Sequence, residues 1–202
     1  MDLLSAAETA QRCQRNWSDT VVSDEDLEHI IRVCTTMPTK GNVPNYRLIV
    51  SQDLELNHRI VETAAHEPTD VDRFAEGIQN HQLLAPTVLL WYGDAHFARV
   101  YNQPDHVFKE DLYNSVGISS GAAALCAASL GYRTGFCKCM ISDVLDQLLA
   151  ESGVLIEPHQ NFVCALGIGA ALEGYAHTAG VYRGRVTHQH RSNDKTISVV
   201  HV

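Results

Sequence analysis

The segment Ser115–Phe136, SVGISSGAAALCAASLGYRTGF, constrains the fold more than any other part of the chain. From Ser119 to Leu130 its residues are small or apolar, and none is charged. A helix without a polar face needs cover on every side, from its own sheet, a second subunit or a flat cofactor. The segment predicts a buried helix, and Gly131 is suited to the left-handed residue that follows a helix end. A plain core helix fits the same pattern.

Length and charge set the broad class of protein. The chain has 202 residues without a linker or low-complexity run, so we expect a single domain over residues 1–202. Its net charge of −9 argues against a nucleic-acid surface, because phosphate binding requires clustered Lys and Arg. The N-terminal residues show no signal-peptide pattern, and no apolar run is long enough to span a membrane. We therefore expect a soluble, cytoplasmic protein.

The cysteines predict reduced thiols rather than disulfides or a metal site. Cys34, Cys126 and Cys164 lie within apolar patterns, which favours buried thiols. Cys137 and Cys139 are separated by one residue, which is not the spacing of zinc or thioredoxin-like sites. We expect no metal site here.

A basic and aromatic patch, Gln11–Trp17, follows a predicted amphipathic helix over residues 3–14. Arg12 and Arg15 of this patch have two interpretations. They bind an anion, or they form a solvated helix end, where positive charge is favourable near the negative end of the helix dipole.

Ser23 and Asp26 predict the start of the next helix, because they form a variant of the capping box. Pro38 ends this helix. The following loop, residues 38–45, is rich in turn formers and leads to a strand over residues 46–50. A polar loop between a helix and a buried strand is a common place for ligand-binding groups.

The remaining periodicities predict strands interleaved with helices, and hence an α/β or α+β fold with four or five strands. We expect helices over 54–65, 71–84 and 144–151, strands over 86–92, 161–166 and 195–202, a turn or extended segment over 132–138, and a loop or short helix over 95–110.

Two local patterns suggest a ligand only weakly. Gly167-x-Gly169 follows a strand, as in dinucleotide-binding motifs, but no third glycine stands at the required spacing. His188 and His190 could bind a metal, yet such a pair without a carboxylate or cysteine beside it is usually a solvated loop. Neither pattern identifies an activity.

Several segments, in the same order, resemble the flavin-dependent nitroreductase family over most of the chain. Gln11–Trp17 is similar to the family's Arg-x-Ser-x-Arg/Lys-x-aromatic signature, and Met37–Tyr46 to its Ala-Pro-Ser-x-x-Asn-x-Gln-Pro-Trp loop. Val116–Arg133 aligns without a gap on the family's central helix, Val-Gly-Ile-Ala-Ala through Leu-Gly-Leu-Gly. Ala85-Pro86 and Ala165–Ile168 resemble its Ala-Pro strand start and its late Ala-Leu-Gly-Tyr strand end.

This resemblance implies a three-layer α/β/α sandwich of the α+β class and a homodimer whose subunits exchange C-terminal segments. It also implies that FMN binds at the subunit interface, takes hydride from NAD(P)H and passes it to a small oxidant such as a nitroaromatic or quinone, in ping-pong order. Arg15 would approach the flavin N1/C2=O edge, and backbone N–H groups near Cys137–Cys139 would face N5. The implied FMN-binding set is Gln11, Arg12, Cys13, Arg15, Thr39, Asn42, Asn80, Cys137, Lys138, Cys139 and Arg191.

The sequence departs from the family at several of these positions. Gln11 replaces an arginine that binds phosphate, Cys13 replaces a serine, and Gln189 replaces a lysine near the tail. Each loss of charge weakens pairing with the phosphate, although Arg12 or His190 could substitute. Two alternatives therefore stay open beside the oxidoreductase: a specialised flavin reaction, such as reductive dehalogenation or flavin fragmentation, and a non-enzymatic dimer that no longer binds FMN productively.

Overall fold

The structure is a computed structural model, and it describes residues 1–11, 13–64, 81–96, 104–172, 180–182 and 185–188. Its elements are, in chain order, α1 Leu3–Ala10, α2 Asp24–Thr35, η1 Lys40–Asn42, β1 Tyr46–Ser51, α3 Leu54–Arg59, η2 Ile60–Ala64, η3 His81–Leu83, β2 Thr87–Asp94, α5 Asp105–Ser129, β3 Arg133–Cys137, α6 Ser142–Glu151, β4 Gln160–Gly169, β5 Gly180–Tyr182 and β6 Arg185–His188.

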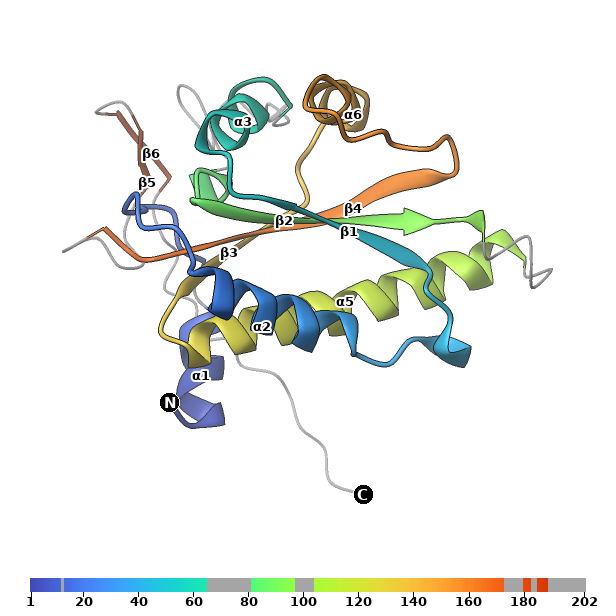
Figure 1. Cartoon of the computed structure of the whole chain (residues 1–202), viewed down its shortest axis with the longest axis horizontal. Helices are drawn as coiled ribbons and strands as arrows, with labels where there is room; N and C mark the ends of the chain where they lie inside the picture. The colour runs from blue at the N-terminus through green and yellow to red at the C-terminus, as the bar shows by residue number, and fades with distance from the viewer. Residues whose placement is uncertain (12, 65–80, 97–103, 173–179, 183–184, 189–202) are drawn as a thin grey trace.

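An antiparallel sheet with the order β1-β2-β4-β3 forms the middle layer. The helices α1, α2 and α5 cover one face of this sheet, and α3 and α6 cover the other (Figure 1). Strands β5 and β6 form a separate two-stranded sheet. The α+β class and the three layers predicted from the sequence are confirmed.

The predicted helix over 54–65 is divided into α3 and the π-helix η2, and α6 and β4 contain the predicted helix over 144–151 and strand over 161–166. The extended segment after Gly131 is β3, which pairs with β4. Of the predicted helix over 71–84, residues 81–83 form η3, and the part up to residue 80 lies outside the described residues. The predicted terminal strand over 195–202 also lies outside them, as does His190.

Helix α5 begins at Asp105, so part of the predicted loop or short helix over 95–110 belongs to the central helix. Phe108, Leu112 and Val116 are buried at a spacing of four residues and continue its apolar face toward the N-terminus. Charged residues stand between them, which makes this part of the sequence look irregular. Residues 97–103 lie outside the described residues.

A single chain does not cover the central helix on every side, so the expected cover from a second subunit or a cofactor stays a prediction. The buried side of the helix carries small hydroxyls that bond to the sheet and its connections: Trp91 donates to the Ser119 hydroxyl at 3.0 Å, and Asn45 donates to the Ser115 hydroxyl at 3.2 Å. On the other side, Tyr113 and Ile118 are 51% and 47% exposed. This single chain therefore leaves an apolar stripe of α5 open to solvent.

Two glycines of the sheet allow η3 to approach it closely. A Cβ atom added at Gly135 or Gly167 would collide with Gln82. Gly167 and Gly169 lie within β4, and Pro86 fills the space beside Gly169. Close packing thus explains the Gly-x-Gly pattern without a dinucleotide.

The predicted cap of α2 is confirmed, because the Ser23 hydroxyl accepts a hydrogen bond from the Asp26 N–H at 3.2 Å. The Tyr132 hydroxyl donates to the Asp26 carboxylate at 2.7 Å. Tyr132 follows Gly131, whose φ of 96° confirms the predicted left-handed residue after α5. This hydrogen bond therefore joins the start of α2 to the end of the central helix.

We expect Tyr132→Phe to lower the urea concentration at the midpoint of unfolding at pH 7. The hydrogen bonds from Tyr132 and Ser23 lower the pKa of Asp26. A carboxyl with a lowered pKa stabilises the fold above its unfolded value, about 3.9, and this contribution is lost as the pH falls through the folded value. The difference between Tyr132→Phe and wild type should therefore shrink below about pH 4. Tyr113→Phe, at a half-exposed ring, serves as the control, and an equal effect of both variants at pH 7 would contradict the assignment.

Candidate active site

The N-terminal segment that follows α1 lies along the outer edge of β3. The Gln14 N–H donates to the Thr134 carbonyl at 2.8 Å. Gly135 makes this approach possible, since a Cβ atom there would lie 2.7 Å from the Gln14 carbonyl oxygen. The contact brings Cys13 and Arg15 beside the strand that ends at Cys137, so three of the predicted site residues, far apart in sequence, meet at one edge of the sheet.

Arg15 has a buried donor that the fold does not use. One terminal nitrogen donates to the Cys13 carbonyl at 3.3 Å, but the buried Nε has no hydrogen-bond partner. Arg15 also lines a cavity of about 310 Å³ together with Trp17, Ser18 and His58. A buried N–H without a partner is costly, and a charged donor gains most from an anionic or carbonyl acceptor. Arg15 is thus the described site residue best suited to a ligand.

The thiols of Cys13 and Cys137 are neutral at pH 7. Burial raises the pKa of Cys13, and the positive charge of Arg15 opposes this only in part. Burial also raises the pKa of Cys137 to about 12, while Cys139 is exposed. Within the described ranges, no group of three His, Cys, Asp or Glu side chains could hold a metal ion. Cys13 and Cys137 are therefore uncharged groups rather than reactive thiolates, and Cys137 packs in the hydrophobic core.

Lys138 connects the end of β3 to the central helix. Its ammonium nitrogen lies 5.1 Å from the centre of the Tyr113 ring, within the range of a cation–π contact. Because Tyr113 lies on the exposed stripe of α5, this contact places a positive charge between the site residues at β3 and that stripe.

Thr39 and Asn42 do not join this group within one chain. They belong to η1 and its N-cap, and η1 is tied to α5 by an ion pair between Lys40 and Asp111 at 3.1 Å. Figure 1 shows η1 and α1 near opposite ends of α5.

The other predicted site residues have no described ligand-binding geometry. Gln11 caps the end of α1 and is exposed. Arg12, Asn80 and Arg191 lie outside the described residues.

A second cavity, of about 510 Å³, lies at the end of the sheet where α5 begins, and the sequence did not predict it. Phe108, Lys109, Tyr113, His159 and Phe162 are among its lining residues. Lys109 and Tyr113 stand four residues apart, so on a helix they share one face, and this spacing is the sequence signal for the cavity wall. The signal could not be used because the sequence predicts a loop or short helix over residues 95–110.

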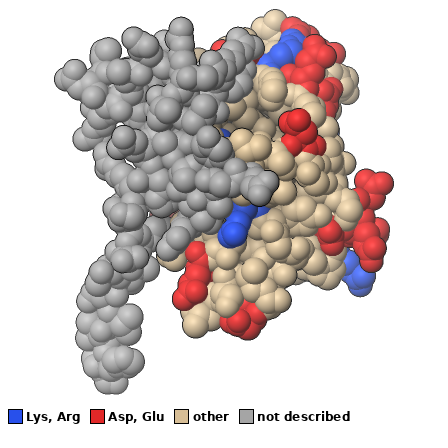
Figure 2. All heavy atoms as spheres, turned by 90° about the vertical axis from the view of Figure 1, so that its left-hand side faces the viewer, with Lys and Arg blue, Asp and Glu red and all other residues tan. Residues whose placement is uncertain are grey.

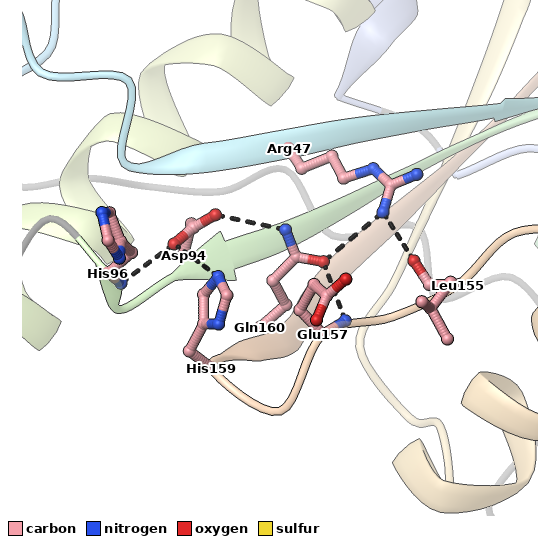
Figure 3. Close-up of polar contacts among 7 residues, drawn as sticks. All are labelled: Arg47, Asp94, His96, Leu155, Glu157, His159 and Gln160. Carbon is pink, nitrogen blue, oxygen red and sulfur yellow. Dashed lines mark hydrogen bonds and ion pairs between the residues drawn. The ribbon is translucent and has the colours of Figure 1, made fainter.

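A chain of polar contacts lies at the edge of this second cavity (Figure 3). Asp94 accepts hydrogen bonds from the backbone N–H of His96 at 2.9 Å and from the Gln160 side chain at 3.1 Å. The His159 Nε2 lies 3.5 Å from the same carboxylate. Arg47 reaches the other end of Gln160 at 3.4 Å and donates to the Leu155 carbonyl at 2.7 Å. These contacts fix His159 at the wall of the cavity.

The surface charge of the described residues follows the composition. On the face drawn in Figure 2, the described Lys and Arg side chains stand apart from one another, with acidic side chains near them. Among the described helices, none combines the length and the apolar composition that crossing a membrane requires.

Comparison with known proteins places this arrangement in a family. The model of the Nitroreductase family matches residues 9–170. The FMN reductase (NAD(P)H) of Bacillus subtilis (strain 168) is 29% identical over 136 residues, which are 62% of this chain and 50% of that protein. The chain thus spans about half the length of this curated relative.

Solved structures agree in fold. A nitroreductase family protein from Clostridium novyi NT matches with a TM-score of 0.67 at 16% identity, over 85% of this chain and 87% of that chain. NfrA2 of B. megaterium matches with a TM-score of 0.64 at 24% identity, over 91% of this chain and 71% of that chain. Since the family model covers most of the chain and the fold agrees, the chain belongs to the nitroreductase family.

Proposed function

We propose that this protein is an FMN-dependent oxidoreductase that takes hydride from NAD(P)H and passes it to a small organic acceptor of the nitroaromatic or quinone type. Membership of the nitroreductase family and the similarity to an FMN reductase (NAD(P)H) support this proposal. The observation that carries it is the buried Arg15 Nε without a partner, at the edge of β3.

The residues at this edge fit a flavin. Arg15 offers a charged donor for the N1/C2=O edge of the ring, where positive charge stabilises the reduced, anionic form. Uncharged Cys13 takes the place of the family serine, and the backbone after Cys137 offers N–H groups toward N5. Gln11, Arg12, Asn80, Lys138, Cys139 and Arg191 complete the proposed set on sequence grounds.

FMN, when bound, supplies the hydride chemistry: it accepts hydride from NAD(P)H and donates it to the acceptor. The protein contributes position and charge. We propose that NAD(P)H and the acceptor use the same site in turn, which gives ping-pong kinetics.

The exposed stripe of α5 supports a homodimer. Tyr113, Gly117 and Ile118 leave an apolar surface beside the site residues, and an exposed apolar surface of this kind is typical of an interface. A second subunit that covers this stripe would bring its own η1, with Thr39 and Asn42, toward the Arg15 site. The outer edge of β1, which pairs only with β2 among the described strands, is open to an exchanged C-terminal segment.

We expect Arg15→Ala to weaken FMN binding by roughly tenfold or more, because a hydrogen bond to a charged group contributes about 1.5–3 kcal/mol. Titration of the apoprotein with FMN, followed by quenching of flavin fluorescence, measures the dissociation constant. Arg15→Lys keeps the charge and should restore part of the affinity.

The matched control is Arg59→Ala, which removes an exposed arginine that pairs with Glu151 and does not line the cavity beside Arg15. FMN affinity should stay within about twofold of wild type in this variant. Equal affinities for wild type and Arg15→Ala would remove Arg15 from the flavin site.

We expect Ile118→Arg to convert a dimer to monomers, because it places a charge in the middle of the proposed interface. Light scattering coupled to size-exclusion chromatography measures the mass in solution. Leu155→Arg is the matched control: Leu155 is also an exposed apolar residue, at 65%, but it lies outside α5. A wild-type monomer, or a dimer that survives Ile118→Arg, would refute an interface on this stripe.

A further inference from the structure

The second cavity, of about 510 Å³, is separate from the cavity lined by Arg15, because the two share no lining residue. Its walls are the first turns of α5, the end of β2 at Gly93 and the start of β4. Lys138, which follows β3, places its ammonium 5.1 Å from the Tyr113 ring at the margin of this cavity. The cavity thus opens beside the segment assigned to the flavin.

One wall of the cavity carries an ordered set of side chains. Asp105, Lys109 and Tyr113 follow one another at four-residue intervals on α5, so they share one face of the helix. Lys109 thus lies one helical turn before Tyr113 on the same face, and the Lys138 ammonium lies over the Tyr113 ring. Two positive groups beside one aromatic surface favour an aromatic ligand that also carries negative charge.

The opposite wall adds an apolar surface and a histidine. Phe162 on β4 supplies the apolar part, and Phe108 extends it from the α5 wall. His159 is 30% exposed and is held by Asp94, whose carboxylate oxygens also accept from His96 and Gln160 (Figure 3). Asp105 is the carboxylate among the described lining residues and would oppose an anion, whereas Asp94 does not line the cavity and lies beside His159.

We propose that this cavity is the acceptor pocket and that it selects aromatic acceptors bearing a carboxylate, with the aromatic part against Phe108 and Tyr113 and the carboxylate facing Lys109 and His159. That the occupant is the acceptor rests on the proposed oxidoreductase function. The selectivity for an anionic aromatic molecule rests on the cavity itself, so binding and turnover test the two claims separately.

The first test measures binding without turnover, with naphthoate and its neutral analogue naphthamide as fluorescent probes of the full chain. Naphthoate should bind more tightly than naphthamide. Lys109→Ala should weaken naphthoate binding by roughly threefold to tenfold, as expected for a partly exposed charged contact, and leave naphthamide binding within about twofold. Asp105→Asn, which removes the opposing carboxylate, should tighten naphthoate binding.

Arg32→Ala is the matched control, because it removes one positive charge from an exposed position on α2. It should leave the affinity for both probes unchanged. Equal affinities for naphthoate and naphthamide, or a loss of naphthoate affinity in Arg32→Ala as large as in Lys109→Ala, would overturn the proposal.

The second test uses the FMN-loaded protein with para-nitrobenzoate and para-nitrobenzamide as acceptors. Lys109→Ala should raise the KM for the acid by roughly threefold to tenfold with kcat nearly unchanged, and Lys109→Arg should restore the wild-type KM. Naphthoate selectivity in a protein that does not reduce any acceptor would overturn the acceptor assignment and the proposed function. If both acceptors are reduced with equal KM, the proposed selectivity of the cavity for a carboxylate is wrong, whereas the proposed flavin oxidoreductase function still holds.

Discussion

Packing of α5 against the sheet is the constraint on which the rest of the structure depends. Ser115, Ser119 and the small residues from Ala123 to Ala128 let this helix lie close to the strands and to α1 and α2. The same helix turns Tyr113 and Ile118 outward. One element therefore organises the core on its side of the sheet, presents the surface that we propose as the subunit interface, and forms one wall of the second cavity.

The site depends on a less conspicuous contact, the hydrogen bond from Gln14 to Thr134 at the edge of β3. It holds Cys13 and Arg15 beside Cys137 although more than a hundred residues separate them in sequence. Replacement of the family arginine and serine by Gln11 and Cys13 leaves Arg15 as the described charged donor of this segment. We expect FMN affinity to depend on Arg15 more than it would in a relative with the full set.

Elements with strong local signals could be predicted from the sequence. The Ser23 cap, the end of α2 before Pro38 and the left-handed Gly131 depend on neighbouring residues, and each is found as expected. The start of α5 at Asp105 could not be predicted, because charged residues separate Phe108 from Leu112 and mask the apolar period. The strand predicted over 86–92 continues to Asp94 in β2, and its Gly93 leaves the space that Leu112, distant in sequence, fills.

The candidate site also depends on contacts between distant segments, which local sequence signals do not predict. The approach of Arg15 to β3 followed only from the family resemblance, since no local pattern predicts a contact between such distant segments. The second cavity was missed because three separate segments form it. Thr39 and Asn42 belong to η1 and its N-cap, and η1 lies near the other end of α5 from α1 (Figure 1), so a single sequence pattern could not show whether they serve the same site as Arg15.

The visible absorption spectrum of the purified protein tests the central claim most directly. It should be recorded after addition of FMN and removal of the unbound flavin, and again after addition of NAD(P)H without oxygen. We expect a flavin spectrum that is retained through desalting and bleached by the reduced nicotinamide. A protein that stays colourless, or that retains flavin which NAD(P)H does not bleach, would contradict this claim.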